Sequence, residues 1–91
     1  MIPWQEMLRE IHAIGLQWKA IGERLDCAGC TVRDYVYGRT ALLVTFERGL
    51  WILDMHRRLC PVSFSQHALE IKSYFRSQMG YEAIRQIMES H

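Results

Sequence analysis

The stretch from Ile21 to Gly38, IGERLDCAGCTVRDYVYG, constrains the fold of this chain more than any other part. Ile21 and Leu25 lie about one helical turn apart, and so do Val32 and Val36. Apolar residues at this spacing form a stripe along one side of a helix. Only a short run, DCAGCT, separates the two stripes. The pattern predicts two short helices that meet across a tight turn.

The residues around the two stripes suit a steep crossing between these helices. A helix-turn-helix needs inward apolar residues on both helices, a compact turn, and a small residue where the second helix approaches the first. Gly22 is that small residue, and Gly38 is suited to end the second helix because glycine readily adopts a left-handed conformation. The spacing therefore indicates a helix-turn-helix with helices near 18–25 and 29–38.

Helical spacing also predicts one helix before this unit and one after it. Pro3 suits the first turn of a helix, and Gly15 suits its end. A longer helix is expected over 46–59, with Thr45 as its N-cap and Pro61 stopping it. The residues expected to face the core are Trp4, Met7, Leu8, Ile11 and Ile14 on the first helix, and Phe46, Leu50 and Leu53 on the longer one.

The C-terminal part of the chain predicts two further short helices. Its apolar residues recur at helical spacing, and Gly80 interrupts the pattern. We therefore predict an all-α fold: a compact helix-turn-helix domain of four helices over 1–61, followed by a helical extension over 62–91. This extension is expected either to cap the core or to act as a dimerisation element.

The stretch IGERLDCAGCTVRDYVYGRT resembles the helix-turn-helix of the Cro/phage-repressor (XRE-like) family, whose usual pattern is I-A-x-x-L-G-V-S-x-x-T-V-S-x-x-x-x-G. The positions that agree outright are Ile21, Leu25, Thr31, Val32 and Gly38. The flanking segments IHAIGLQWKAIG and LDMHRRLCP are also similar to the family, so the resemblance covers residues 4–61. It implies a sequence-specific DNA-binding transcriptional regulator of phage or mobile-element type, acting as a dimeric repressor.

Several positions differ from the family pattern. Asp26 stands where the family has Gly, and we expect it to adopt a left-handed conformation, which Asp tolerates. Trp18 replaces the usual Gln. Gly29 and Cys30 occupy the first exposed positions of the second helix, where the family usually has polar residues. The start of this helix therefore has few side-chain groups that could hydrogen-bond to the edge of a base.

The resemblance implies that the second helix of the unit enters the major groove. Arg33 is the main candidate for a base contact, because a guanidinium can bind both acceptors of guanine. Asp34 opposes DNA unless it pairs with Arg33 or with a cytosine amino group, and Arg24 suits a phosphate contact. The contact surface implied for double-stranded DNA consists of Trp18, Lys19, Gly29, Cys30, Thr31, Arg33, Asp34, Tyr37, Arg39 and Thr40.

A homodimer is the expected assembly, because such domains double their contacts across a two-fold DNA site. Trp51, Ile52 and Met55 are predicted to lie on the side of helix 46–59 that faces away from its core residues. Together with Phe75 they are the candidates for the dimer interface. The alternative is that the C-terminal helices cover them.

The cysteines and histidines allow a weaker hypothesis of a metal or redox site. Cys27, Cys30, Cys60 and His56 have suitable ligand atoms, but a strong zinc pattern has two paired clusters at set spacing. A thioredoxin-like role would need a strand before CxxC, and none is predicted. The four histidines form no triad pattern. We expect solvated or half-buried histidines, no metal, no cofactor and no enzymatic activity.

The overall charge leaves a second function open. The chain carries 11 basic and 10 acidic residues, and this net charge of +1 neither supports nor excludes DNA as a ligand. Together with a hydrophobic content of 49%, it motivates an alternative hypothesis, a protein-interaction module on the same fold, such as a small phage inhibitor or adaptor.

We expect a cytoplasmic protein without membrane association. The chain has three cysteines, an odd number that argues against a disulfide framework. The N-terminal segment MIPWQEMLRE lacks the basic and apolar regions of a secretory signal. No apolar run approaches the ~18–20 residues that span a bilayer.

Overall fold

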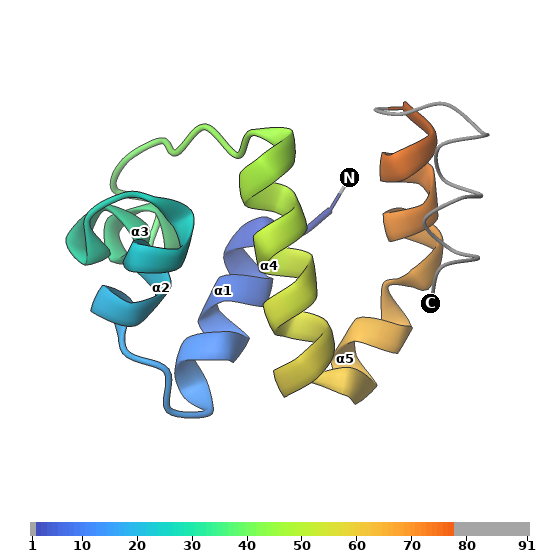
Figure 1. Ribbon diagram of the computed structural model, residues 1–91, viewed down its shortest axis with the longest axis horizontal. Helices are drawn as coiled ribbons and strands as arrows, with labels where there is room; N and C mark the ends of the chain where they lie inside the picture. The colour runs from blue at the N-terminus through green and yellow to red at the C-terminus, as the bar shows by residue number, and fades with distance from the viewer. Residues whose placement is uncertain (1, 78–91) are drawn as a thin grey trace.

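The computed structural model describes residues 2–77, and every regular element in this part is a helix (Figure 1). The all-α prediction is therefore confirmed, whereas the break predicted at Gly80 lies outside the described residues. No helix within 2–77 combines the length and the apolar character that crossing a bilayer requires. The helices are α1 (Trp4–Ala13), α2 (Trp18–Leu25), α3 (Gly29–Val36), α4 (Phe46–Leu59), α5 (Pro61–Gln66) and a helix that includes residues 68–77.

Helices α1 and α4 pack against each other at the centre of the molecule (Figure 1). The α2–α3 unit lies on one side of them, and α5 with the helix of 68–77 lies on the other. Ile14 was expected to face the core but is 54% exposed, because α1 ends one residue earlier and Gly15 turns the chain away with a φ of 117°. The buried core consists mainly of Met7, Leu8, Ile11, Ile21, Leu25, Val32, Ile52, Leu53 and Met55.

The inward face of α4 differs from the predicted one. Leu50 was expected to face the core but is 36% exposed, and Phe46 is half-buried. The buried residues of the helix are instead Gly49, Ile52, Leu53, Met55 and His56. The reason is tertiary, since α4 contacts α1, α2 and α5 at once and its buried face is wider than a single stripe.

The ends of α4 agree with the sequence-based expectation. The Thr45 hydroxyl accepts a hydrogen bond from the backbone N–H of Arg48 at 3.2 Å, which confirms the predicted N-cap. Pro61 follows the end of α4, as expected, and also forms the first residue of α5. Proline suits that position because the first N–H groups of a helix have no partner within it.

Aromatic contacts join the helix of residues 68–77 to the core. The Tyr74 ring meets the Trp4 ring edge-on, with 5.4 Å between centroids, and lies 6.3 Å from the Phe46 ring. Gly49 leaves room for these rings, because a Cβ atom there would lie 3.0 Å from both Trp4 Cη2 and the Tyr74 hydroxyl. The C-terminal helix therefore packs against α1 and α4 through side chains.

Candidate nucleic-acid interface

The α2–α3 unit is built on direct backbone contact between its two helices. A Cβ atom on Gly22 would lie 2.5 Å from the carbonyl oxygen of Cys27 and 2.8 Å from the amide nitrogen of Gly29. A Cβ atom on Gly29 would lie 2.8 Å from the amide nitrogen of Lys19. These neighbours are main-chain atoms, which cannot give way unless the helices separate. The two glycines thus set the position of α3 on α2.

The turn between the helices ends α2 in a Schellman motif. Asp26 adopts a left-handed conformation, with φ 57° and ψ 48°, as predicted. The backbone N–H of Cys27 donates to the carbonyl of Gly22 at 2.9 Å, and the N–H of Asp26 donates to the carbonyl of Glu23 at 3.4 Å. This turn directs the chain straight into α3, so the orientation of α3 follows from local geometry.

The outer face of α3 forms the centre of the candidate interface. Val32 is fully buried, and Tyr35 and Val36 pack against the core, so the opposite side of the helix is exposed. The Tyr37 side chain that follows the helix is 58% exposed. The residues on or beside this outer face are Cys30, Arg33, Asp34, Tyr37 and Arg39.

Asp34 joins two arginines on this outer face. Its Oδ1 accepts hydrogen bonds from Nε and Nη2 of Arg33, both at 3.3 Å, and lies 3.7 Å from Nη1 of Arg39. Two cations and one anion leave this group with a net charge of +1. The structure thus contains the Asp34–Arg33 pair that would remove the conflict between the carboxylate and a phosphate backbone.

Gly38 brings Arg39 back to this group. Its φ of 76° ends α3 in a second Schellman motif, in which the N–H of Arg39 donates to the carbonyl of Asp34 at 2.7 Å. The Arg39 guanidinium also lies 5.7 Å from the centre of the Tyr37 ring. The predicted helix end at Gly38 therefore places a cation beside the outer face of α3.

Trp18 contributes packing to the unit. Its ring stacks on His12, with 3.9 Å between centroids and 13° between planes, and meets the Tyr37 ring edge-on at 6.3 Å. His12 Nδ1 donates to the carbonyl of Leu16 at 2.9 Å, because a carbonyl can only accept. Trp18 therefore fixes the start of α2 against the end of α1 and of α3.

Some of the remaining residues of the predicted contact surface pack against the chain, and the others are exposed to solvent. Gly29 was expected to be an exposed position, but it is half-buried against the backbone of α2. Thr31 is half-buried, while Lys19, Cys30 and Thr40 are exposed. The structure thus brings Arg33, Asp34, Tyr37 and Arg39 together and gives Trp18 and Gly29 a supporting role.

Arg48 positions the α2–α3 unit, although no sequence pattern indicates this role. Its Nε donates to the carbonyl of Leu25 at 2.9 Å and its Nη1 donates to the carbonyl of Leu43 at 2.9 Å. Arg48 therefore ties the end of α2 and the connector before α4 to α4 itself. Periodicity carries no signal for this role, because both acceptors are main-chain carbonyls and that of Leu25 lies 23 residues away in the chain.

Two of the four residues predicted for a dimer interface belong to the core of the chain. Ile52 and Met55 are 0% and 3% exposed, so they offer no surface to a partner. Phe75 is half-buried, and its ring lies 6.3 Å from the Phe46 ring, edge-on. The prediction was wrong for Ile52 and Met55 because it assigned too narrow a buried face to α4. Trp51 remains 44% exposed.

Cys27 and Cys60 do not have the environment of reactive thiolates. Burial raises the pKa of the Cys27 thiol, an effect that the Arg48 charge partly offsets and the Asp26 charge increases. Burial and the Glu10 charge raise the pKa of the Cys60 thiol. Metal-binding and redox cysteines instead have a lowered pKa. Within residues 2–77, no three His, Cys, Asp or Glu side chains are grouped closely enough to hold a metal ion.

His56 is fully buried, in contrast to the expectation of a solvated or half-buried ring. Its Nε2 lies 3.4 Å from Oε1 of Glu10, which also accepts a hydrogen bond from the Ser63 hydroxyl at 3.0 Å. Because a carboxylate only accepts, Nε2 carries the proton, and Nδ1 is buried without a partner in the described part of the chain. This group joins α1, α4 and α5.

Comparisons of the chain with protein-family models, with curated proteins and with solved structures found no match. The function is therefore inferred from the geometry of the chain itself.

Proposed function

We propose that this chain is a transcriptional regulator of phage or mobile-element type that binds double-stranded DNA as a homodimer and represses a promoter. The observation that supports this most directly is the exposed group of Arg33, Asp34, Tyr37 and Arg39 on a tightly crossed pair of helices. Crossed helices of this kind place the second helix in the major groove.

In the proposed complex, Arg33 contacts a guanine and the residues around it contact phosphates. Asp34 holds the Arg33 guanidinium on the outer face of α3 before DNA arrives, which lowers the entropy cost of ordering a long side chain. Tyr37, Arg39 and the exposed Lys19 supply donors to phosphates, which fix the register of the protein on the duplex.

Selection of binding sites from a random duplex library, at low and at moderate salt, tests this proposal. We expect an enriched palindromic site whose half-site spacing reports the dimer geometry. Arg33→Ala is expected to relax selectivity at one base pair by ~1–3 kcal/mol, whereas Arg39→Ala weakens binding to all sequences alike. Lys72→Ala, at an exposed cation of the helix of residues 68–77, is the control and leaves binding unchanged.

Two results would contradict the proposal. In the first, Arg33→Ala leaves both affinity and selectivity unchanged, which removes α3 from the contact surface. In the second, binding disappears at moderate salt and no sequence is enriched, which indicates electrostatic attraction alone.

Exposed apolar side chains favour a second candidate function, a protein-interaction module on the same fold. Leu43, Val62 and Leu69 are 76%, 73% and 82% exposed, and exposed apolar surface is frequent at protein interfaces. Charge reversal at Lys19 and Arg39 distinguishes the two candidate functions, DNA binding and protein interaction. A cellular effect that survives these substitutions supports protein interaction, and one that is lost supports DNA binding.

A further inference from the structure

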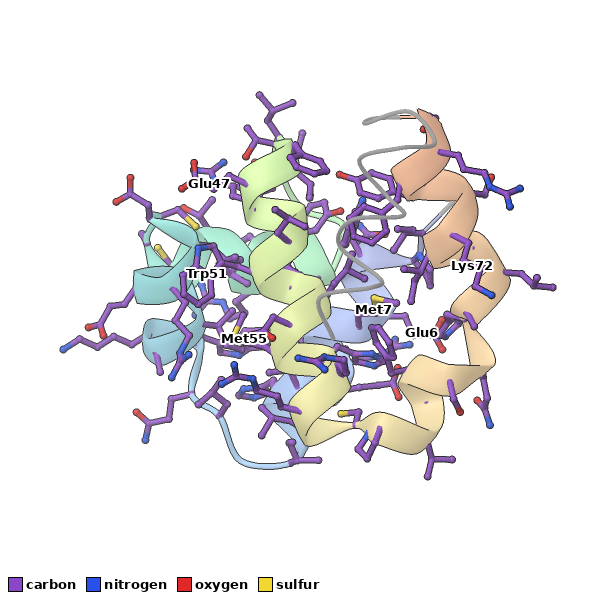
Figure 2. The ribbon with its side chains drawn as sticks, turned by 45° about the vertical axis from the view of Figure 1, so that its right-hand side comes forward. Glu6, Met7, Glu47, Trp51, Met55 and Lys72 are labelled. Carbon is purple, nitrogen blue, oxygen red and sulfur yellow. The ribbon has the colours of Figure 1, made fainter. Side chains whose placement is uncertain are left out.

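An exposed apolar pair on α4 is left uncovered by the elements that the structure describes. Leu50 and Trp51 are 36% and 44% exposed, and they are adjacent in the chain. Figure 2 shows Glu47 and Trp51 projecting from the same side of α4. A groove of about 260 Å³ lies beside Trp51, between α4 and the α2–α3 turn, and extends this face toward Arg24.

Charges of opposite sign lie on either side of this apolar pair along the helix. Glu47 lies about one turn before it, and Arg57 and Arg58 lie about two turns after it. Asp54 pairs with both arginines, at 3.2 Å to Nη2 of Arg57 and 3.3 Å to Nε of Arg58, so this end has a net charge of +1. Along the exposed stripe of α4, Glu47 is the acidic residue at the start, the centre is apolar and the end is positive. Arg48 also lies near the start, but its guanidinium donates to the carbonyls of Leu25 and Leu43, and Arg24 lines the groove from α2.

We propose that this face of α4 binds a second copy of the chain, with the two α4 helices antiparallel across a two-fold axis near Trp51. A patch that is negative at one end and positive at the other is complementary to itself after a rotation of 180°. Antiparallel packing lays Glu47 of each copy beside Arg57 and Arg58 of the other. Parallel packing would instead bring like charges together.

The dimensions of α4 suit this arrangement. Its 14 residues extend over ~21 Å, so the apolar centre and both charged ends are in reach of a second helix. The groove beside Trp51 adds surface next to α4. That addition matters because a stable interface buries about 800 Å² on each partner.

This inference deepens the proposed function, since it assigns the surface of the proposed homodimer, but its test uses the protein without DNA. The two failures are therefore distinguishable. A monomer that still selects a DNA sequence overturns only the dimer. A dimer of the expected kind that selects no sequence overturns only the proposed function.

Sedimentation equilibrium of the full chain, from low micromolar to near-millimolar concentration, tests the apolar centre. We expect a monomer–dimer equilibrium in which Trp51→Asp raises the dissociation constant by at least ~30-fold, because buried Trp residues are frequent hot spots. Leu69→Asp is the matched control, because Leu69 is 82% exposed on another helix. A wild-type protein that stays monomeric, or an equal loss in both variants, overturns the proposal.

Charge substitutions test the antiparallel arrangement independently of Trp51. Glu47→Lys is expected to raise the dissociation constant about tenfold, because it introduces repulsion at both ends of the interface. Mixing these chains with chains that carry Arg57→Glu and Arg58→Glu is expected to restore association, because both ends then pair opposite charges. If Glu47→Lys alone leaves association unchanged, the helices are not antiparallel. Circular dichroism melting of each variant checks that the fold is retained.

Discussion

The α2–α3 unit and the C-terminal helices are attached to the molecule in different ways. In the α2–α3 unit, main-chain atoms of one helix touch those of the other at Gly22 and Gly29. The C-terminal helices contact the core through side chains, namely a shared carboxylate at Glu10 and the ring contacts of Tyr74. The first attachment leaves no room for a side chain, whereas the second consists of contacts that can be removed individually.

The difference shows where the molecule is most sensitive to small changes in volume. A backbone contact cannot be relieved by choosing another rotamer, so an added methyl group in the α2–α3 unit moves a whole helix. A lost side-chain contact at α5 leaves the backbone of both elements in place. Small changes in side-chain volume are therefore tolerated least in the α2–α3 unit, which carries Arg33 and is followed by Arg39.

The largest effect is expected from Gly22→Ala. The added Cβ atom would lie 2.5 Å from the Cys27 carbonyl oxygen. Overpacking of this kind costs more than the helix propensity that alanine gains over glycine, and we expect a net loss of about 2–3 kcal/mol in the free energy of unfolding. Chemical denaturation measures it, with Glu23→Ala on the exposed side of α2 as the control. A loss no larger than that of the control would show that α2 and α3 separate at little cost.

A smaller effect is expected from Glu10→Ala, which removes the acceptor shared by His56 and Ser63. The buried His56 ring then has no partner for Nε2, and leaving one such group unsatisfied costs about 1–3 kcal/mol. We expect faster amide hydrogen exchange in α5, while exchange in α2 and α3 changes only with global stability. Glu6→Ala, on the exposed side of α1, is the matched control. Equal changes in α3 and α5 would show that the two regions are not independent.

Asp26→Gly is expected to stabilise the protein by about 0.5–1 kcal/mol, because Asp26 has a positive φ and glycine adopts that conformation without steric cost. Asp26→Ala is the companion variant and should lower the melting temperature. A higher melting temperature for Asp26→Ala, or a lower one for Asp26→Gly, would mean that the Asp26 side chain stabilises the protein more than its backbone conformation indicates.

The smallest effect is a gradual loss of stability at alkaline pH. Burial raises the pKa of Cys27 and Cys60 above the ordinary value of 9.0, and that of Tyr35 and Tyr74 above 10.0. A raised pKa means that the unfolded chain releases these protons first. The stabilisation is therefore complete below the ordinary values and is lost as pH rises through the raised ones.

Denaturation at a series of alkaline pH values measures this loss in both regions of the molecule. Tyr35 and Cys27 belong to the α2–α3 unit, whereas Tyr74 and Cys60 belong to the C-terminal part. Tyr74→Phe and Cys27→Ser are each expected to make the stability less dependent on pH. A stability that stays constant as the pH rises above 9.0 would exclude the effect for the cysteines, and one that also stays constant above 10.0 would exclude it for the tyrosines.

The course of the chain from one element to the next can be predicted from local sequence. The bounds of α2 and α4, the cap at Thr45, the left-handed Asp26 and the turn at Gly38 all agree with expectation. These features depend on residues a few positions apart, through caps, turns and hydrogen bonds within one helix. Local sequence is sufficient for them because the interacting groups are neighbours in the chain.

Which groups from different elements meet depends on how the helices pack together, and local sequence does not predict it. This packing buries His56, exposes Leu50, places Gly29 against the backbone of α2 and ties Arg48 to the carbonyls of Leu25 and Leu43. Asp34 and Arg33 are neighbours in sequence, but Arg39 joins them only because Gly38 folds the chain back. Periodicity shows that a helix has an apolar side. The number of neighbours that a helix contacts decides how wide its buried side becomes, and that number depends on how the whole chain packs.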